Sequence, residues 1–320
     1  MSDRATLVVA IMPTYNRREM MARAVESVFA QTRRPDIFLV LDHASSDGSA
    51  EELARLAGSK PMDFRILTKT GNIGASGAMR FLIDEALKLK PDWIWFMDDD
   101  AAAEPRALGA LLDAPESRDS SVMLLESTVV DGNGVWTEAN RPAIFKPETF
   151  EFEGLPENAL DSGRALEVHT GGYCGWFARP KCFEEFGYPR DDFYFWFDDI
   201  EYVVRVSRKS KVYLIPGSRI RHYATSLVPH ERRWPFSGPL PKIPLQHLER
   251  YFYWNRNWLW FAKQWLPRAK YATFWLKHVA RGIAAPVLFH QDHLARRARL
   301  VLMAGLDALR GRLGKRPGVE

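Results

Sequence analysis

The chain has 320 residues, 46% of them hydrophobic and 26% charged, a balance that predicts a globular protein with a substantial core. No apolar stretch reaches the roughly 18 residues that a membrane-spanning helix requires, and the first apolar segment is too short for a signal peptide. The two cysteines, Cys174 and Cys182, fit no metal or redox spacing, so we interpret them as reduced thiols of a cytoplasmic protein. The net charge of +4 is uneven, because the segment after Lys263 is rich in Lys and Arg.

The first part of the chain alternates predicted strands and helices. Apolar runs predict strands at 7–12, 37–41 and 64–67, and the intervening patterns predict helices at 19–31, 50–56 and from the glycine-rich turn to about residue 89. Pro13 is expected to end the first strand. This order is typical of an α/β protein with a mainly parallel sheet.

A polar segment follows each of these strands: Pro13–Arg18, Asp42–Ser49 and Gly71–Gly77. Because the carboxyl ends of parallel strands meet at one edge of a sheet, we expect these segments to line one crevice. Each segment alone is typical of an ordinary turn or helix cap. Together they favour a nucleotide-binding crevice, in which the glycine-rich turn presents backbone N–H groups to a phosphate.

Five apolar residues, Trp93–Met97, predict a strand buried on both faces, and three carboxylates follow it directly. Three adjacent acids repel one another unless a cation or several donors satisfy them. Since alternate residues of an extended segment point the same way, Asp98 and Asp100 can face one ligand while Asp99 points elsewhere. Mg²⁺ or Mn²⁺ fits this arrangement. The alternative is a solvated acidic turn before a predicted helix at 101–112.

Four motifs taken in order resemble those of the family 2 glycosyltransferases of GT-A fold: Pro13–Arg17, Asp42–Ser49, Asn72–Gly74 and Asp98–Asp100. The resemblance covers roughly residues 7–225 and implies an inverting enzyme that uses a nucleotide-sugar donor. At position 43 the chain has His where the family often has Asp or Asn. This departure concerns one contact to the nucleotide base.

The resemblance also implies site residues. The donor would be bound by Pro13, Thr14, Tyr15, Arg17, Asp42, Asn72, Gly74, Asp98 and Asp99, and the metal by Asp98, Asp100 and His222. The expected division is a catalytic domain at 1–225, with donor binding at 7–115 and acceptor binding at 165–225, followed by a linker and helical region at 226–320.

A second aromatic run, Phe193–Phe197, ends in Asp198, Asp199 and Glu201, four residues before Arg205. Inverting transfer needs one general base for the acceptor hydroxyl. The resemblance assigns this role to Asp199 and acceptor binding to Asp198, Glu201 and Trp176. The alternative is that these acids cap a helix at 200–209 and that Glu201 pairs with Arg205 at i+4.

A last strand is predicted at 212–216, and His222 follows it. A lone histidine is more often structural, but in relatives of this family a histidine at this point completes the metal shell, and imidazole suits Mn²⁺ better than Mg²⁺. Arg219 or Arg221 could face the diphosphate.

Beyond residue 225 a proline-rich linker precedes helices. The aromatic-aromatic-x-x-Arg-Asn pattern in 251–257 and the basic tail at 309–315 resemble bacterial galactofuranosyl- and rhamnosyltransferases that act on lipid-linked acceptors. Tryptophans interleaved with Lys and Arg after residue 258 predict peripheral binding to the anionic inner face of the cell membrane. A packed helical hairpin or a homo-oligomer contact is the alternative.

The expected function is therefore transfer of galactofuranose or rhamnose from a UDP- or dTDP-sugar to a lipid-linked or polysaccharide acceptor, with Mn²⁺ or Mg²⁺ as cofactor. The alternative is a catalytically inactive nucleotide-sugar- or polysaccharide-binding module of the same fold. Nucleic-acid binding is disfavoured, because the basic residues follow no nucleic-acid motif.

Overall fold

A computed structural model of the protein describes residues 6–58, 61–223, 233–234, 237–239, 245–285 and 292–319. The chain forms two compact units. The first comprises Met1–Lys146, Glu151–Pro189 and Asp199–Ala224, and the second comprises Pro147–Phe150, Arg190–Asp198 and Thr225–Glu320. The predicted proline-rich linker lies largely outside the described residues.

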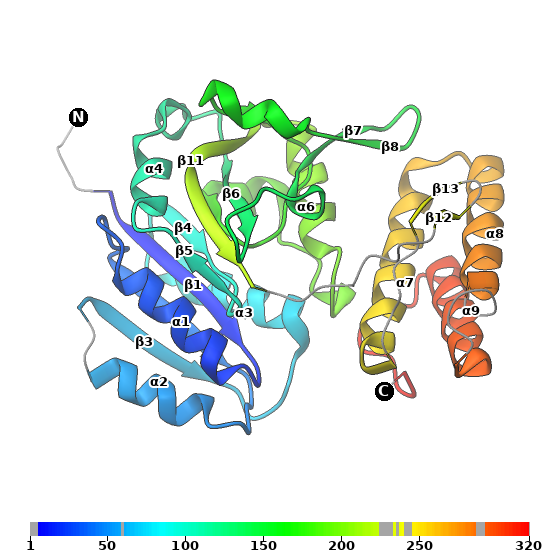
Figure 1. The fold of residues 1–320 in the computed structure, drawn as a ribbon, viewed down its shortest axis with the longest axis horizontal. Coiled ribbons are helices and arrows are strands. Elements are labelled where there is room, and N and C mark those ends of the chain that lie inside the picture. Colours follow the sequence, from blue (N-terminus) through cyan, green and yellow to red (C-terminus); the bar gives the residue numbers. More distant parts are fainter. Residues whose placement is uncertain are drawn as a thin grey trace. The chain divides into compact units, whose positions relative to one another are not determined.

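A nine-stranded sheet forms the centre of the first unit, in the order β3-β2-β1-β4-β10-β6-β11-β5, with β9 paired to β11 (Figure 1). Its strands are β1 (Val8–Thr14), β2 (Ile37–Asp42), β3 (Asp63–Thr68), β4 (Trp93–Phe96), β5 (Ala101–Ala103), β6 (Leu124–Asp131), β9 (Leu166–Glu167), β10 (Trp176–Ala178) and β11 (Val212–His222). The strands β3, β2, β1 and β4 are parallel, as predicted, and β10 runs antiparallel to β4 and β6.

The carboxyl ends of the first strands are in register. Thr14 pairs with Asp42, and Asp42 pairs with Thr68. The prediction that Pro13 ends the first strand is wrong, because β1 continues through Pro13 to Thr14. The pairing with β4 stops at Ile11. At Pro13 no hydrogen bond to β4 is needed, so the missing N–H of this proline costs the sheet nothing there.

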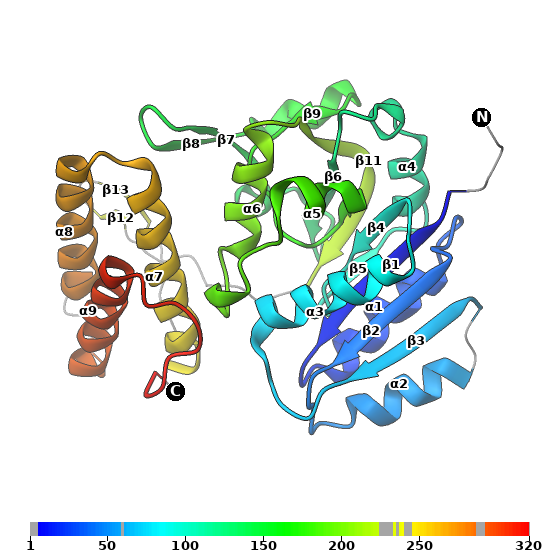
Figure 2. The same cartoon turned by 180° about the vertical axis from the view of Figure 1, so that it is seen from behind.

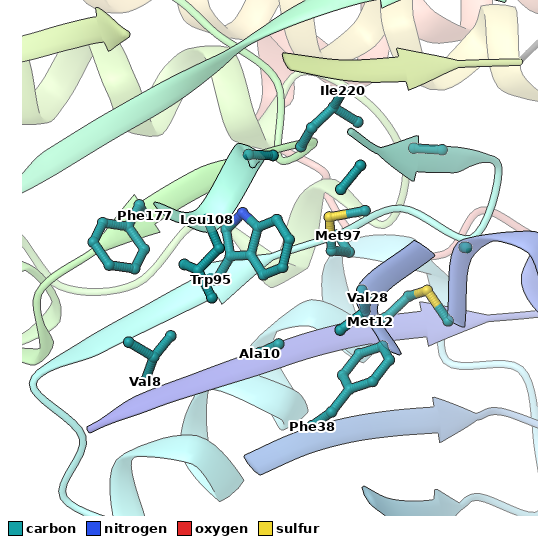
Figure 3. Close-up of a cluster of buried hydrophobic side chains, with 14 of the residues drawn as sticks. Val8, Ala10, Met12, Val28, Phe38, Trp95, Met97, Leu108, Phe177 and Ile220 are labelled. Atoms are coloured by element: carbon teal, nitrogen blue, oxygen red, sulfur yellow. The ribbon is translucent and has the colours of Figure 1, made fainter. Parts of the chain in front are cut away.

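Helices cover both faces of this sheet. They are α1 (Arg18–Phe29), α2 (Ser49–Gly58), α3 (Gly74–Lys88), α4 (Ala107–Asp113), α5 (Pro180–Phe186) and α6 (Asp198–Ser207). One core joins α1, α2 and α4 to one face, and Figure 3 shows part of it around Trp95, Met12 and Phe38. A second core joins α3, α5 and α6 to the opposite face of the sheet. Figure 2 shows the ribbon from the side of these helices.

Two predictions next to the acidic triplet are wrong. Residues 101–112 are not one helix, because Ala101–Ala103 form strand β5 and α4 begins only at Ala107. The last strand does not end at residue 216 but continues to His222. The two corrections have one cause, since β5 pairs antiparallel with the far half of β11, with Ala101 opposite His222.

The described residues of the second unit form the helices α7 (Leu248–Trp265), α8 (Arg268–Ala285) and α9 (Leu294–Arg310). Close contact between α8 and α9 depends on glycines: a Cβ added at Gly282 would lie 2.7 Å from Val301, and one at Gly305 would lie 2.9 Å from Val279. Two hairpins are also described, β7 (Ala143–Lys146) with β8 (Glu151–Gly154) in the first unit, and β12 (Arg233–Trp234) with β13 (Ser237–Pro239) in the second. Among the described residues, no helix is long and apolar enough to cross a membrane.

Candidate active site

An acidic cluster lies where β4, β5 and the end of β11 meet. The ligand atoms of Asp98, Asp100 and His222 all lie within 4.8 Å of one another. His222 Nε2 is 3.0 Å from Asp100 Oδ1 and 3.9 Å from Asp98 Oδ2. The pairing of β5 with β11 delivers the histidine to this place. Two carboxylates and one imidazole form a donor set that fits a divalent cation such as Mg²⁺ or Mn²⁺.

The charges of the cluster are not balanced within it. Burial, the neighbouring carboxylate of Asp100 and that of Asp99 raise the pKa of Asp98 well above its usual value. Burial by itself would raise the pKa of Asp100 as well, but the hydrogen bond and charge of His222, together with Arg17, lower it. The surroundings therefore favour the charged form of Asp100 and disfavour the charged form of Asp98. A divalent cation would stabilise the charged form of Asp98.

Asp99 points away from this cluster and holds the loop between β1 and α1. Its carboxylate accepts hydrogen bonds from Thr14 Oγ1 (2.9 Å), from the backbone N–H of Tyr15 (3.4 Å) and from Arg17 Nη1 (3.1 Å). Arg17 Nη1 also donates to Asp100. Burial raises the pKa of Asp99 to about 6, although the charge of Arg17 opposes this. The Arg17 guanidinium therefore links the β1–α1 loop to the cluster of Asp98, Asp100 and His222, called the cation-ligand cluster below.

The other predicted donor residues lie in loops that contact one another at the same edge. The rings of Tyr15 and His43 are 5.3 Å apart, and burial lowers the pKa of His43, although the charge of Asp42 and the side chain of Asn72 oppose this. Asp42 is buried and accepts a hydrogen bond from the backbone N–H of Ser45. His43, which departs from the family pattern, thus lies between two predicted donor residues.

Gly74 begins α3 and has a φ of +77°, a conformation that glycine adopts readily. Its backbone N–H donates to Asn72 Oδ1 at 2.8 Å, so the asparagine fixes the turn into the helix. Asn72 and Gly74 are thereby tied to each other at the edge where the donor is expected.

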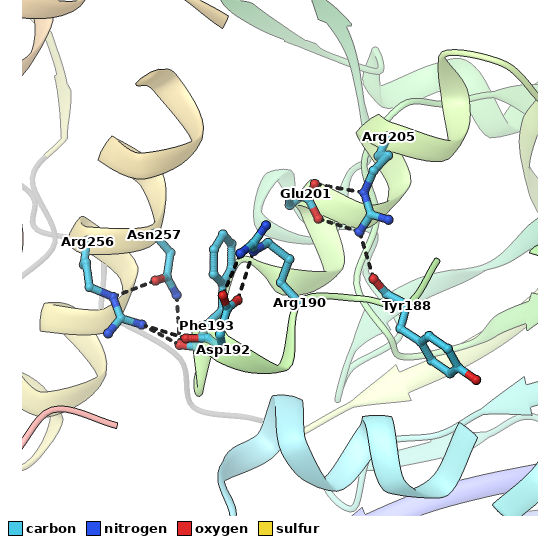
Figure 4. Close-up of polar contacts among 8 residues, drawn as sticks. All are labelled: Tyr188, Arg190, Asp192, Phe193, Glu201, Arg205, Arg256 and Asn257. Carbon is cyan, nitrogen blue, oxygen red and sulfur yellow. Dashed lines mark hydrogen bonds and ion pairs between the residues drawn. The ribbon is translucent and has the colours of Figure 1, made fainter. Parts of the chain in front are cut away.

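The acidic motif lies at the N-terminus of α6. Asp199 is partly exposed, whereas Asp198 is buried, with 3% of its surface exposed. Glu201 forms a two-point ion pair with Arg205, at 3.0 Å and 2.9 Å, which is the i+4 alternative raised by the sequence (Figure 4). Because Asp198 is buried and Glu201, which is also partly exposed, pairs with Arg205, Asp199 is the acid of the three that best meets the need of a general base for access to a bound acceptor.

A buried carboxyl group beside Asp199 was missed by the sequence reasoning. Glu126 lies in β6 with 3% of its surface exposed, and a Cβ added at Gly171 would lie 2.0 Å from its Oε2. A Cβ added at the next residue, Gly172, would lie 3.5 Å from Asp199 Oδ2. Burial and the charge of Asp199 raise the pKa of Glu126 well above its usual value. The strand also contains Ser127, Thr128 and Asp131, so the local sequence offered no signal that sets Glu126 apart.

Other predicted residues lie outside this cluster. Trp176 is fully buried and its ring packs 4.6 Å from that of Tyr173, so it belongs to the core beneath the site rather than to a surface open to an acceptor. Arg221 pairs with Glu104 at 3.1 Å, and Arg219 donates to the carbonyl of Gly134 at 3.3 Å. The roles assigned to these residues stay predictions.

The sheet and its loops define an α/β protein that has a donor set fit for a divalent cation at one edge of the sheet. The chain belongs to glycosyl transferase family 2, whose family model matches residues 9–186. The predicted family is therefore confirmed, and with it the class of enzyme, a glycosyltransferase.

Galactofuranosyltransferase GlfT1 of Mycolicibacterium smegmatis is 34% identical over 107 residues, which are 33% of this chain and 34% of that protein. Galactofuranosyltransferase GlfT1 of Mycobacterium tuberculosis is 32% identical over 111 residues, 34% of this chain and 36% of that protein. The matched region thus spans about a third of the length of these relatives.

Three solved structures share the fold. GalNAc-T7 with UDP, GalNAc and Mn²⁺ has a TM-score of 0.60 at 12% identity and covers 97% of this chain and 57% of its own. Mannosyltransferase PcManGT from Pyrobaculum calidifontis with GDP-Man and Mn²⁺ has a TM-score of 0.55 at 14% identity, with 97% and 89% covered. S. aureus TarS 1–349 has a TM-score of 0.57 at 12% identity, with 96% and 82% covered. The predicted fold class, with its helical C-terminal region, is confirmed.

Proposed function

We propose that this chain is an inverting, metal-dependent glycosyltransferase that moves a sugar from a UDP- or dTDP-sugar to a lipid-linked or polysaccharide acceptor. The observation that carries the proposal is the position of Asp98, Asp100 and His222 at the sheet edge formed by the donor loops. Galactofuranose is the favoured sugar, with rhamnose as the alternative, because two relatives are named galactofuranosyltransferases.

In this proposal Asp98, Asp100 and His222 would hold Mn²⁺ or Mg²⁺, which would supply positive charge against the leaving diphosphate. Arg17 keeps the β1–α1 loop against the same carboxylates and adds a positive charge beside them. Tyr15, Asn72 and Asp42 line the loops that would receive the nucleoside.

Asp199 would take the proton of the acceptor hydroxyl as that oxygen attacks the anomeric carbon. The glycosidic bond to the acceptor forms as the bond to the diphosphate breaks, on the opposite face of the sugar. Burial and the charge of Asp199 raise the pKa of the buried Glu126 carboxyl, which favours its protonated form beside this base. It would donate a hydrogen bond to the base rather than compete with it for the proton.

One assay tests the proposal against an inactive binding module. The protein is incubated with Mn²⁺ and a panel of UDP- and dTDP-sugars, and nucleoside diphosphate release is measured with and without a lipid-linked glycan acceptor. We expect release that depends on one donor, on the metal and on the acceptor. Donor binding without any release would support the binding module instead.

Membrane association is a further part of the proposal, and the structure changes the residues on which it depends. Most of the aromatic side chains that were expected to face lipid pack within the second unit: Phe261 is buried, and Trp275 Nε1 donates to the carbonyl of Gly305 at 2.9 Å. Among the described residues of this unit, the exposed large apolar side chains are leucines: Leu245, Leu276 of α8 (62% exposed) and, on α9, Leu294, Leu302 (41%), Leu306 (39%) and Leu309 (38%). The spacing of Leu302, Leu306 and Leu309 places these three on one side of α9, with exposed Arg299 and Arg310 nearby.

We expect the double substitution Leu302→Ser and Leu306→Ser to reduce binding to anionic vesicles, because it removes apolar surface without removing the arginines. Flotation with phosphatidylglycerol vesicles measures this, and binding of the unaltered protein should fall at high salt. Vesicles of phosphatidylcholine alone serve as the control. Equal flotation of the two proteins would favour the packed hairpin or a homo-oligomer contact at this surface.

A further inference from the structure

The segment that leads into the acidic motif has an unusual backbone. Tyr194, Trp196 and Phe197 have φ values of 64°, 62° and 75°, in the left-handed region that large side chains rarely adopt. Such a conformation persists only where the surrounding structure imposes it, and it is most often found at functional sites. Asp198 and Asp199 follow this segment directly, at the start of α6.

Asn257 of α7 imposes this conformation. Its side-chain Nδ2 lies within hydrogen-bond distance of three backbone carbonyls of the segment, those of Phe193 (3.2 Å), Phe195 (3.1 Å) and Trp196 (2.8 Å). The asparagine is fully buried, so water cannot replace these bonds. The Asn257 side chain thus holds the carbonyls on both sides of Tyr194, the first residue with a positive φ. It also holds the carbonyl of Trp196, the second such residue.

Arg256 fixes the asparagine and the start of the segment. Its Nε donates to Asn257 Oδ1 at 3.0 Å, which sets the amide so that its N–H groups face the carbonyls (Figure 4). Its Nη2 donates to the carbonyl of Phe193 at 2.9 Å, and its Nη1 donates to that of Gly314 at 2.6 Å. The Arg256 side chain is fully buried. The network therefore ties α7, the C-terminal tail and the segment 192–197 together.

We propose that Arg256 and Asn257 are positioning residues for the general base: they hold the left-handed segment 192–197 in the form that presents Asp199. This inference rests on the proposed function, in which Asp199 is the base. Arg256 and Asn257 are the Arg-Asn pair of the aromatic-aromatic-x-x-Arg-Asn pattern. The inference explains this pair by its hydrogen bonds to the segment 192–197. The pair acts through the backbone of the segment and contacts neither donor nor acceptor in this role.

The chain offers a matched control in Asn255. It lies on the same helix and is equally buried, but its Nδ2 donates to the carbonyl of Tyr251 at 2.7 Å and its Oδ1 is 2.6 Å from His278 Nε2. Asn255→Leu and Asn257→Leu remove the same amide from the same helix. Only Asn257→Leu releases the segment before Asp199.

We expect Asn257→Leu to lower kcat by about 10- to 100-fold, because a small displacement of a catalytic group costs that much. Donor affinity, measured by calorimetry, should stay within about threefold of that of the unaltered chain, as expected when transition-state interactions alone are lost. Asn255→Leu should keep kcat within about threefold on the same reasoning. Arg256→Lys keeps the charge but loses the planar fork, so it should change kcat in the same direction and replaces Asn257→Leu if that variant does not fold.

A second measurement does not depend on catalysis. Amide hydrogen exchange of peptides covering 190–200 should be about 10-fold faster in Asn257→Leu than in Asn255→Leu, because the segment loses its bonds. Equal exchange in the two variants would overturn the network, and faster exchange with equal kcat would overturn the positioning role. If the unaltered chain transfers no sugar, the proposed function fails and the positioning role with it, whereas the exchange result still decides whether the pair holds the segment.

Discussion

Replacing Asp199 by asparagine is expected to lower kcat by about 10² to 10⁴-fold, the range associated with loss of a general base. The amide keeps the shape of the side chain and can still accept the hydrogen bond that the Ile200 backbone N–H donates to Oδ1 at 2.7 Å. The basicity alone is lost. Donor affinity should hardly change, because the base contributes in the transition state and not to donor binding.

Asp198→Asn is the matched control for this prediction. Asp198 precedes Asp199 but is buried, with 3% of its surface exposed, so its substitution should lower kcat less. A folding defect would depress turnover and donor binding together. Steady-state rates and calorimetric donor titrations of both variants separate these cases. If Asp199→Asn turns over at a near-normal rate, the base lies elsewhere, and Glu201 or Asp198 would be the next residue to test.

Removing a carboxylate from the cation-ligand cluster is expected to abolish turnover. Asp98→Ala leaves Asp100 and His222 as the two remaining ligands, and Asp100→Ala also removes the partner of His222 and of Arg17. The two remaining side chains would hold a divalent cation less well than the full set of three. Mn²⁺-dependent donor binding should weaken in both variants.

Titration of each variant with Mn²⁺ alone, followed by the donor, measures metal binding separately from activity. Asp113→Ala, an exposed carboxylate at the end of α4, is the control and should bind both as the unaltered protein does. Unchanged Mn²⁺ and donor affinity in Asp98→Ala and Asp100→Ala would show that this cluster is not the metal site. The solvated acidic turn would then be the better interpretation of the triplet.

Much of the donor half of the site could be predicted from local pattern. A buried strand such as the one predicted at Trp93–Met97 cannot continue through three carboxylates. The strand therefore had to end before Asp98. In a parallel sheet this end lies beside the ends of the other strands, and the pairing of Thr14 with Asp42 shows that alignment. Asp98 and Asp100 are separated from Asp99 as expected, but Asp99 and Asp100 lie in a turn, so the alternation of an extended chain is not the reason.

The acceptor half depended on contacts between distant residues. Nothing within its own segment distinguishes Glu126 from an ordinary strand residue, and only the approach of Gly171 and the charge of Asp199 show how confined it is. The resemblance assigned Trp176 to acceptor binding, whereas the sheet places it in the core. The Arg256-Asn257 pair was visible in the sequence only as part of a family pattern, and its bonds to the segment 192–197 could be seen only in the structure.

The sequence by itself determined the family, through its ordered motifs, and it determined the first four strands and the edge at which their polar loops meet, through local hydrophobic patterning and the geometry of parallel sheets. Only the tertiary structure decided how Asp98, Asp100 and His222 come together. Ala101–Ala103 favour a helix by their own propensity, and they form a strand because the far half of β11 offers them hydrogen-bond partners. That pairing carries His222 to Asp98 and Asp100 across more than a hundred residues of sequence, a distance at which local pattern holds no information.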